Sequence, residues 1–316
     1  MESQELKHRL GPENFKKRRL IEDGYRKSFV KFGRWDIHFN YMLKIMKSAE
    51  LCVKVSGLWK RGVRNSLEYE VNDRRWFFPN LPKAFEGFRI LHLSDLHIDG
   101  VPDRGTALKK KVEALEADML VITGDFRYEP HKGTEAMVSV MREFLKGLHY
   151  PHGICGILGN HDAIDMVEPL EKTGLRFLLN ESLEIRKDGE SFRLIGVDDP
   201  HFYQLHDLER AFRNVPPGAF KLLLAHSGEI AHAASEIGAD FYLCGHSHGG
   251  QICLPGGVPV IGNSRSARKY FKGAWTYGRM QGYTSSGTGT SGVPVRFFSR
   301  PEIVVHRLFL PSSKSI

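Results

Sequence analysis

The sequence predicts an α/β fold. Short apolar runs rich in Leu, Ile and Val end in polar clusters, and amphipathic stretches separate several of these runs. Such runs are typical of strands buried on both faces, and their alternation with helices indicates a sheet covered by helices. The chain has 316 residues, which is enough for one large domain or for a domain with an extension.

Five apolar runs end at a carboxylate, an imidazole or an amide. The predicted strands and the polar residues after them are 88–93 before Asp95 and His97, 119–123 before Asp125, 153–158 before Asn160, 220–225 before His226, and 241–244 before His246 and His248. Helices are predicted over 106–115 and 134–148, and further strands over 192–198 and 304–310. We interpret the Ser/Thr/Gly-rich stretch 284–292 as an ordered loop.

These strand ends predict a metal site. In α/β sheets, ligands collect outside the carboxyl ends of the strands, so the polar residues are expected on one rim. Carboxylate oxygens and imidazole nitrogens suit manganese, iron or zinc. Seven ligands exceed the needs of one tetrahedral ion, but they suit two divalent cations about 3.5–4 Å apart that share a bridging carboxylate.

Residues 1–86 are predicted to form a basic, partly amphipathic extension, followed by a catalytic domain over 87–316. Residues 1–68 contain sixteen Lys and Arg against eight Asp and Glu, whereas the rest of the chain is balanced. Apolar residues at helical spacing lie at Phe39, Met42, Leu43, Met46, Ala49 and Val53. Such a helix either lies on an anionic membrane through residues 1–60 or docks on its own domain.

The rest of the sequence favours an intracellular protein. None of the four cysteines forms a Cys-x-x-Cys pair, so a disulfide framework is not expected. The sequence contains neither a signal peptide nor a run of 18 apolar residues. We therefore expect a cytoplasmic protein whose contact with a membrane, if any, is peripheral and on the inner face.

The motifs resemble those of the calcineurin-like metallophosphoesterase superfamily. The motifs are Ser94-Asp-Leu-His, Gly124-Asp, Gly159-Asn-His-Asp, His226 and Gly245-His-Ser-His. The segments 249–256, 287–296 and 300–303 are similar to one bacterial branch, which contains membrane-associated phosphodiesterases and a UDP-2,3-diacylglucosamine pyrophosphatase of lipid A synthesis. The resemblance implies a four-layer αββα sandwich of two mixed sheets flanked by helices, the metallo-dependent phosphatase fold.

The resemblance also implies a role for each residue. Asp95, His97 and His248 would bind the first metal, Asn160, His226 and His246 the second, and Asp125 would bridge them. His161 would protonate the leaving oxygen or stabilise the phosphoryl charge, with Asp162 orienting its ring or raising its basicity. Arg265, Arg268 and Lys269 are candidates for binding a second phosphate, although a solvated charged loop explains them equally well.

We expect a metal-dependent phosphodiesterase or pyrophosphatase, with a lipid-linked nucleotide diphosphate such as UDP-2,3-diacylglucosamine as the favoured substrate. The enzymatic alternative is a soluble phosphodiesterase that acts on nucleotides or simple phosphodiesters. A non-catalytic scaffold is a different alternative, but the intact ligand set argues against it. A nucleic acid is the less favoured partner of the basic segment. Salt-dependent binding of DNA or RNA by residues 1–75 alone would favour it.

Overall fold

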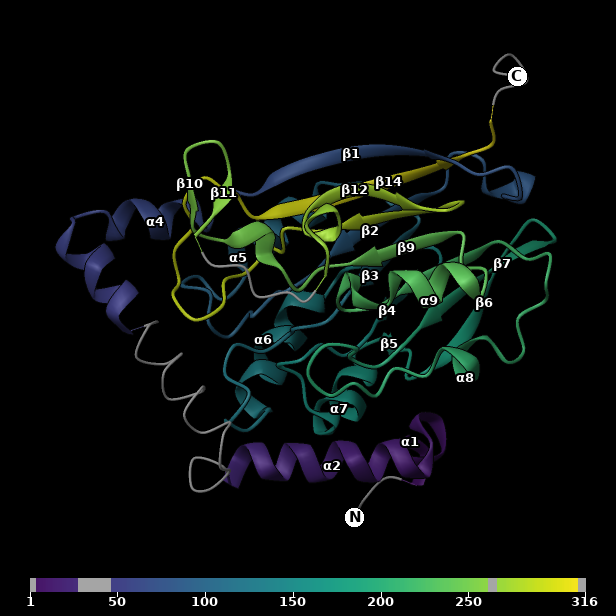
Figure 1. Cartoon of the computed structure of the whole chain (residues 1–316), viewed down its shortest axis with the longest axis horizontal. Coiled ribbons are helices and arrows are strands. Elements are labelled where there is room, and N and C mark those ends of the chain that lie inside the picture. The colour runs from purple at the N-terminus through teal and green to yellow at the C-terminus, as the bar shows by residue number, and fades with distance from the viewer. Residues whose placement is uncertain (1–3, 28–46, 261–265, 312–316) are drawn as a thin grey trace.

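The computed structural model describes residues 4–27, 47–260 and 266–311. Two six-stranded mixed sheets face each other, and helices cover their outer faces (Figure 1). The predicted αββα sandwich is therefore confirmed. The first sheet has the order β1 (Glu70–Phe77), β14 (Glu302–Phe309), β2 (Arg89–Leu93), β3 (Met119–Ile122), β4 (Ile154–Gly156), β5 (Leu175–Phe177). The second has the order β12 (Gly273–Tyr277), β13 (Met280–Thr284), β9 (Phe241–Cys244), β8 (Lys221–Leu224), β7 (Glu190–Gly196), β6 (Glu181–Lys187).

Four of the described helices precede the first strand, and the others lie between strands in sequence. The predicted helices over 106–115 and 134–148 are present with slightly shorter bounds. The described helices are α1 (Gln4–Leu10), α2 (Pro12–Lys27), residues 47–55, α4 (Trp59–Asn65), α5 (Thr106–Glu113), α6 (Glu135–Leu145), α7 (Val167–Glu171), α8 (Leu208–Phe212) and α9 (Ala231–Glu236). Short 3-10 turns are η1 (Lys83–Phe85), η2 (Ile164–Met166), η3 (Gly228–Ile230), η4 (His248–Gly250) and η5 (Arg268–Tyr270), and β10 (Cys253–Leu254) pairs with β11 (Val258–Pro259) as a hairpin.

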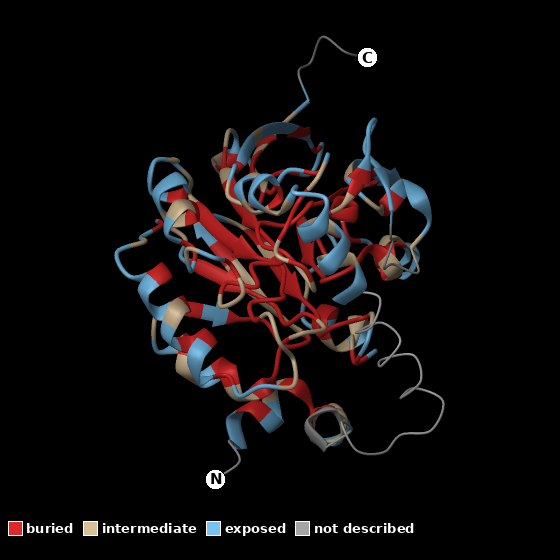
Figure 2. Cartoon of the chain, turned by 90° about the vertical axis from the view of Figure 1, so that its left-hand side faces the viewer, coloured by how far each residue is buried: buried red, intermediate tan, exposed pale blue. Residues whose placement is uncertain are grey.

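The strand directions bring the predicted polar motifs together. In the first sheet β2, β3, β4 and β5 run parallel, and in the second β7, β8, β9 and β13 run parallel. The carboxyl ends of the parallel strands in each sheet therefore lie at one edge. Buried residues fill the space between the sheets and the layers beneath the helices (Figure 2). The loops that follow β2, β3, β4, β8 and β9 stand on this packed frame.

Residues 70–77 correct the predicted boundary at residue 87. They form β1, which pairs in parallel with β14 along eight residues at the edge of the first sheet. The boundary therefore cuts through the sheet. This strand was not predictable from the sequence, because most of its residues are exposed and polar, as an edge strand permits.

The segment α1–α2 docks on the domain. Leu6, Leu10 and Phe15 are buried in the core beneath α5, α6 and α7. Arg9 pairs with Glu171 and Glu181, so part of the basic charge of this segment is neutralised within the fold. For these residues the docking alternative holds.

Most of the apolar stripe predicted over 39–53 lies outside the described residues. Its described members, Ala49 and Val53, are half-buried. No helix in the described ranges combines the length and apolarity that crossing a bilayer requires.

Candidate metal centre

Seven side chains from five loops converge at the carboxyl ends of the strands. The loops follow β2, β3 and β4 of one sheet and β8 and β9 of the other, so both sheets contribute. All seven are buried except the half-buried Asn160. The converging residues are Asp95, His97, Asp125, Asn160, His226, His246 and His248. The structure thus brings together the complete set of predicted ligands.

The backbone at this site is held in an uncommon conformation. Asp95, His97, Asp125, His246 and His248 all have positive φ values, between 40° and 71°. A residue with a Cβ pays roughly 1–2 kcal/mol to enter the left-handed region. Five such residues among seven indicate that the surrounding fold imposes the geometry, as is common where side chains must be aimed at a ligand.

One group of donors surrounds Asp95 and His97. The Nε2 atoms of His97 and His248 are 3.2 Å apart, and His248 Nε2 lies 3.5 Å from Asp95 Oδ1. Asp125 Oδ2 is 3.5 Å from His97 Nε2. Ligand atoms of Asp95, His97 and His248 all lie within 4.8 Å of one another, which is compatible with one cation among them.

A second group lies on the other side of Asp125. Asn160 Oδ1 is 2.9 Å from both His226 Nε2 and His246 Nδ1. Asp125 Oδ2 is 3.4 Å from His226 Nε2. Asp125 is therefore the residue whose carboxylate reaches both groups, which is the position that a bridging ligand requires.

Backbone carbonyls fix the tautomers of two imidazoles. His97 Nδ1 donates to Arg127 O at 2.7 Å, and His226 Nδ1 donates to Thr123 O at 2.7 Å. A carbonyl accepts only, so the proton must lie on Nδ1 and Nε2 is directed at the cluster. This arrangement of a carbonyl behind the ring is common among metal-binding histidines.

The electrostatics of the cluster fit divalent cations. Burial, aided by His161, lowers the pKa of His97 to about 3, and burial raises the pKa of Asp95 to about 6. Burial alone would lower the pKa of His226, but Asp125 raises it well above its ordinary value. The buried carboxylates thus draw positive charge to this spot, which His97 lines as a neutral imidazole. Carboxylate, imidazole and amide donors without a thiolate suit manganese, iron or zinc.

His161 lies beside the cluster, but Asp162 does not hold its ring. His161 Nδ1 donates to Tyr128 O at 2.7 Å, and the ring centroid lies 4.6 Å from that of His97. The Asp162 carboxylate instead accepts from the backbone N–H groups of Asp125 and Gly159, both at 2.8 Å. The role predicted for Asp162 is therefore corrected: the carboxylate joins the β3 and β4 loops.

Two glycines allow the loops to approach this closely. A Cβ on Gly159 would collide with the Asp125 carboxylate and lie 2.9 Å from the His226 ring. A Cβ on Gly245 would collide with the side chains of Ser94 and Asp95. Both positions therefore require the absence of a side chain.

Two buried arginines escaped the sequence analysis. Arg127 donates to His161 O and, through Nη1, to Lys132 O at 2.8 Å. Arg296 donates from Nη2 to Ser286 O at 2.8 Å and from Nη1 to His248 O at 3.3 Å. The available signals were the position of Arg127 two residues after Asp125 and that of Arg296 at the end of the Gly-rich stretch. Both arginines fix the carbonyls of the ligand loops.

A third cluster of possible ligands borders the second group. His201, which the sequence analysis did not single out, places its Nδ1 2.6 Å from Glu229 Oε1 and its ring centroid 4.0 Å from that of His246. Ligand atoms of His201, Glu229 and His246 lie within 4.8 Å of one another. His201 lacked a strand-end motif, so its position was not predictable from spacing.

The predicted phosphate-binding residues are placed only in part. Arg268 and Lys269 are exposed on η5. Phe271, two residues after Lys269, accepts a hydrogen bond through its carbonyl from the hydroxyl of Ser247, which lies between two of the predicted ligands. Lys269 Nζ lies 4.7 Å from the centroid of the Tyr270 ring. Arg265 lies outside the described residues.

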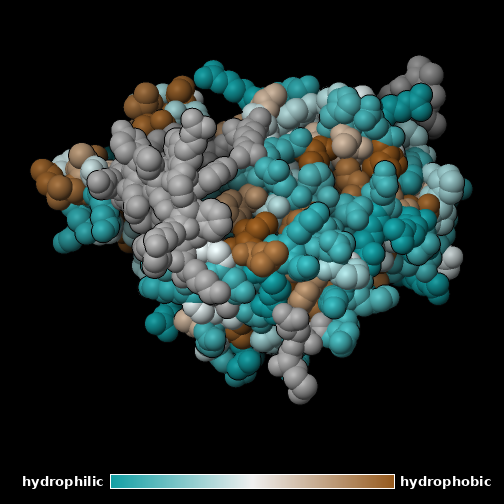
Figure 3. Space-filling model, turned by 60° about the horizontal axis from the view of Figure 1, so that its bottom comes forward, coloured by the Kyte–Doolittle hydropathy of each residue, from teal (hydrophilic) through white to brown (hydrophobic). Residues whose placement is uncertain are grey.

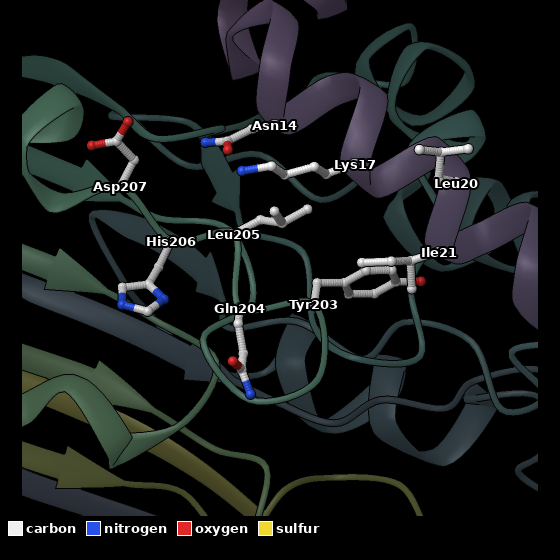
Figure 4. Close-up of a pocket in the computed structure, with 9 residues that line it drawn as sticks. All are labelled: Asn14, Lys17, Leu20, Ile21, Tyr203, Gln204, Leu205, His206 and Asp207. Atoms are coloured by element: carbon white, nitrogen blue, oxygen red, sulfur yellow. The ribbon is translucent and has the colours of Figure 1, made fainter. Parts of the chain in front are cut away.

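A pocket of about 530 Å³ runs along α2 (Figure 4). Asn14 and Lys17 line one side, and the segment from Tyr203 to Asp207 lines the other. None of the seven converging residues lines it.

The chain is similar to known proteins. The family model described as calcineurin-like phosphoesterase matches residues 88–250. The uncharacterized metallophosphoesterase YkoQ of Bacillus subtilis is 28% identical over 279 residues, which cover 84% of this chain and 100% of YkoQ. The UDP-2,3-diacylglucosamine pyrophosphatase LpxG of Chlamydia muridarum is 26% identical over 292 residues, covering 72% of this chain and 86% of LpxG.

Among solved structures, the calcineurin-like phosphoesterase YfkN of Bacillus subtilis aligns with a TM-score of 0.37 and 16% identity, covering 64% of this chain and 82% of that chain. The family match includes all five strand-end motifs. The chain belongs to the calcineurin-like phosphoesterase family and is a metal-dependent phosphoester hydrolase.

Proposed function

We propose that the chain is a phosphodiesterase or pyrophosphatase that works with two divalent cations, manganese, iron or zinc. One observation carries the proposal: seven donor side chains from both sheets converge around the Asp125 carboxylate. Asp95, His97 and His248 would hold the first cation. Asn160, His226 and His246 would hold the second, and Asp125 would be shared by the two sites.

The chain's own residues supply positioning and proton transfer. When bound, two cations neutralise charge that develops on the phosphoryl oxygens and lower the pKa of the attacking water. His161 directs its Nε2 away from the Tyr128 carbonyl that fixes its Nδ1, and it donates a proton to the leaving oxygen. The Asp125 carboxylate accepts the His161 backbone N–H at 2.8 Å, which ties the acid to the bridging ligand.

The favoured substrate is a lipid-linked nucleotide diphosphate. The similarity to LpxG, named as a UDP-2,3-diacylglucosamine pyrophosphatase, supports this class. A second phosphate would meet Arg268 and Lys269 on the exposed η5 segment. A soluble phosphodiesterase that acts on simple diesters is the alternative outcome of the substrate test.

A membrane-facing surface supports the lipid substrate. Leu51, Val55 and Leu58 are 62%, 80% and 44% exposed. Leu51 and Val55 lie four residues apart in the helix 47–55, and Leu58 directly precedes α4. Exposed cations lie beside them in the same segment, namely Lys54, Lys60, Arg61 and Arg64. Figure 3 shows apolar surface at the end of the molecule that carries this segment. Apolar side chains flanked by cations suit the interface of an anionic bilayer on the cytoplasmic side.

Hydrolysis assays of the full chain with manganese test the proposal. The substrates are UDP-2,3-diacylglucosamine in mixed micelles, bis-p-nitrophenyl phosphate and p-nitrophenyl phosphate. We expect both of the first two to be hydrolysed, with the highest kcat/KM for the lipid. Asp125→Asn is the control, and it abolishes all turnover. Preference for the monoester contradicts the diesterase function, and turnover of the diester without the lipid selects the soluble alternative.

A further inference from the structure

Arg18 of α2 joins the N-terminal segment to two loops of the domain. It is fully buried, at 0% exposure. Its Nε donates to Glu22 Oε1 at 2.9 Å, its Nη2 donates to Asp162 O at 2.7 Å, and its Nη1 pairs with Asp198. The guanidinium also stacks on Tyr203, with Cζ 4.0 Å from the ring centroid. All three guanidinium nitrogens thus have an acceptor, and the Tyr203 ring covers one face of the plane.

The first partner is the residue directly after His161. The Asp162 carbonyl accepts from Arg18 and also from the Tyr203 hydroxyl, at 3.1 Å. The Asp162 carboxylate holds the backbone N–H of Asp125. The guanidinium therefore fixes the peptide that ends the His161 turn, at the point where this turn is joined to the bridging ligand.

Glu22 ties a second point of the same loop to α2. Glu22 Oε1 accepts the Ile164 backbone N–H at 2.8 Å as well as the guanidinium Nε. One turn beyond His161, the loop is thus held by the same side-chain pair.

The other partner leads to the second cation site. Asp198 Oδ1 accepts the Asp199 backbone N–H at 2.8 Å. The Asp199 carboxylate in turn accepts the N–H groups of His201 and Tyr203, at 3.1 and 2.8 Å. The His201 ring lies against that of His246. A chain of short contacts thus runs from the buried guanidinium to both sides of the metal centre.

We propose that Arg18 of α2 is a positioning residue, which sets the His161 turn against the loop 198–203. The inference rests on the proposed function. Docking alone is already provided by the buried side chains of Leu10 and Phe15. A buried guanidinium must be fully paired to be tolerated. Here each of the three guanidinium nitrogens has an acceptor: the Asp162 carbonyl, Asp198 or Glu22.

Arg18→Lys tests this role because it keeps the charge and removes the fork. The readout is the dependence on the leaving group, since His161 protonates the departing oxygen. Methyl p-nitrophenyl phosphate has a good leaving group and methyl phenyl phosphate a poor one. We expect a loss in kcat of about 10- to 100-fold on the poor leaving group, the scale of a misplaced catalytic group. The loss on the good leaving group is smaller, and both KM and metal content stay at the parent values.

Tyr203→Phe is the gentler second variant, because it removes only the hydroxyl that donates to Asp162 O. It is expected to lower kcat on the poor leaving group about fivefold, the effect of one hydrogen bond. Because the substitution removes a single hydroxyl, a lower kcat in this variant is not explained by unfolding.

Arg9→Lys is the matched control. Arg9 makes a similar fork from the same arm, to Glu171, Glu181 and the Phe177 carbonyl, away from the metal loops. It should leave kcat on both diesters unchanged. Equal losses on the two diesters in Arg18→Lys, or parent activity in both test variants, would overturn the positioning role. An inactive parent enzyme would refute the proposed function and this role together.

Discussion

At the scale of single residues, the candidate centre depends on one carboxylate. Asp125 Oδ2 lies 3.5 Å from His97 Nε2 and 3.4 Å from His226 Nε2, so it faces both donor groups. Its backbone is held with φ of 56° by hydrogen bonds from the neighbouring loops. The geometry of the pair of sites is thus set by the placement of this side chain.

Asp125→Asn should release both cations or leave a weakly bound pair, because a neutral amide has a single oxygen and lacks the negative charge with which a carboxylate bridges two metals. Elemental analysis of the purified protein after gel filtration measures the metal content per chain. Asp188→Asn, in an exposed turn at φ of 47°, is the control and should match the parent. Two tightly held cations in the Asp125 variant would refute the bridging assignment.

His161→Ala should keep both cations and lower kcat by about 10²- to 10⁴-fold, the range for a general acid. The imidazole is anchored by the Tyr128 carbonyl and has no carboxylate behind it. The kcat and the metal content are measured on the same preparation. A preparation that has lost a metal would show that His161 is a ligand.

At the scale of elements, β2 and β14 share a buried polar chain. Trp76 Nε1 donates to His306 Nδ1 at 2.9 Å, so the proton of His306 lies on Nε2 and faces His92 Nδ1 at 3.3 Å. His92 Nε2 then donates to Thr123 Oγ1 at 2.9 Å. Each ring is neutral in this arrangement, and burial lowers the pKa of His92 to about 3.

Acid should destabilise the fold through these rings. The unfolded chain binds protons at His92 and His306 below a pH of about 6.5, whereas the folded chain does not. Stability is therefore complete above that pH and falls as the pH decreases, by about 1.4 kcal/mol per unit for each ring. Urea unfolding at pH 7.5 and 5.5 should show a smaller decrease in His306→Met than in the parent. An equal decrease in the two proteins contradicts the neutral chain.

The elements divide into those that local patterns predict and those that they do not. The strands before Asp95, Asp125 and His246 were predictable because an apolar run and a polar end both mark a buried parallel strand. β1 was not, because its pairing with β14 spans more than 200 residues and leaves no local signal. The sequence predicts Arg18 only as one basic residue of the extension, because it does not reveal that the guanidinium is buried among carboxylates.

At the scale of the whole molecule, the chain carries a candidate metal centre and, elsewhere, the surface that we propose for membrane contact. Both sheets meet at the candidate centre, α1–α2 packs on the domain, and the segment 47–64 presents exposed Leu51, Val55 and Leu58. The sequence predicted the convergence of all seven side chains, because each follows a strand in the same orientation. It did not predict which basic residues form ion pairs within the fold, because pairs such as Arg9 with Glu171 depend on tertiary structure.

Leu51→Ser combined with Val55→Ser should weaken binding to phosphatidylglycerol vesicles, because two exposed apolar side chains leave the proposed interface. Cosedimentation at low and high salt measures the bound fraction, which should also fall with salt. Leu254→Ser, which changes an exposed apolar side chain of the β10–β11 hairpin, serves as the comparison and should bind like the parent. A bound fraction that is unchanged in the double variant would remove the support for a lipid substrate.

Anomalous diffraction from crystals of the full chain grown with manganese tests the two-cation centre most directly. We expect two anomalous peaks about 3.5–4 Å apart, one on each side of the Asp125 carboxylate. The first should contact Asp95, His97 and His248, and the second Asn160, His226 and His246. A single peak, or two peaks that Asp125 does not join, would contradict the two-cation mechanism.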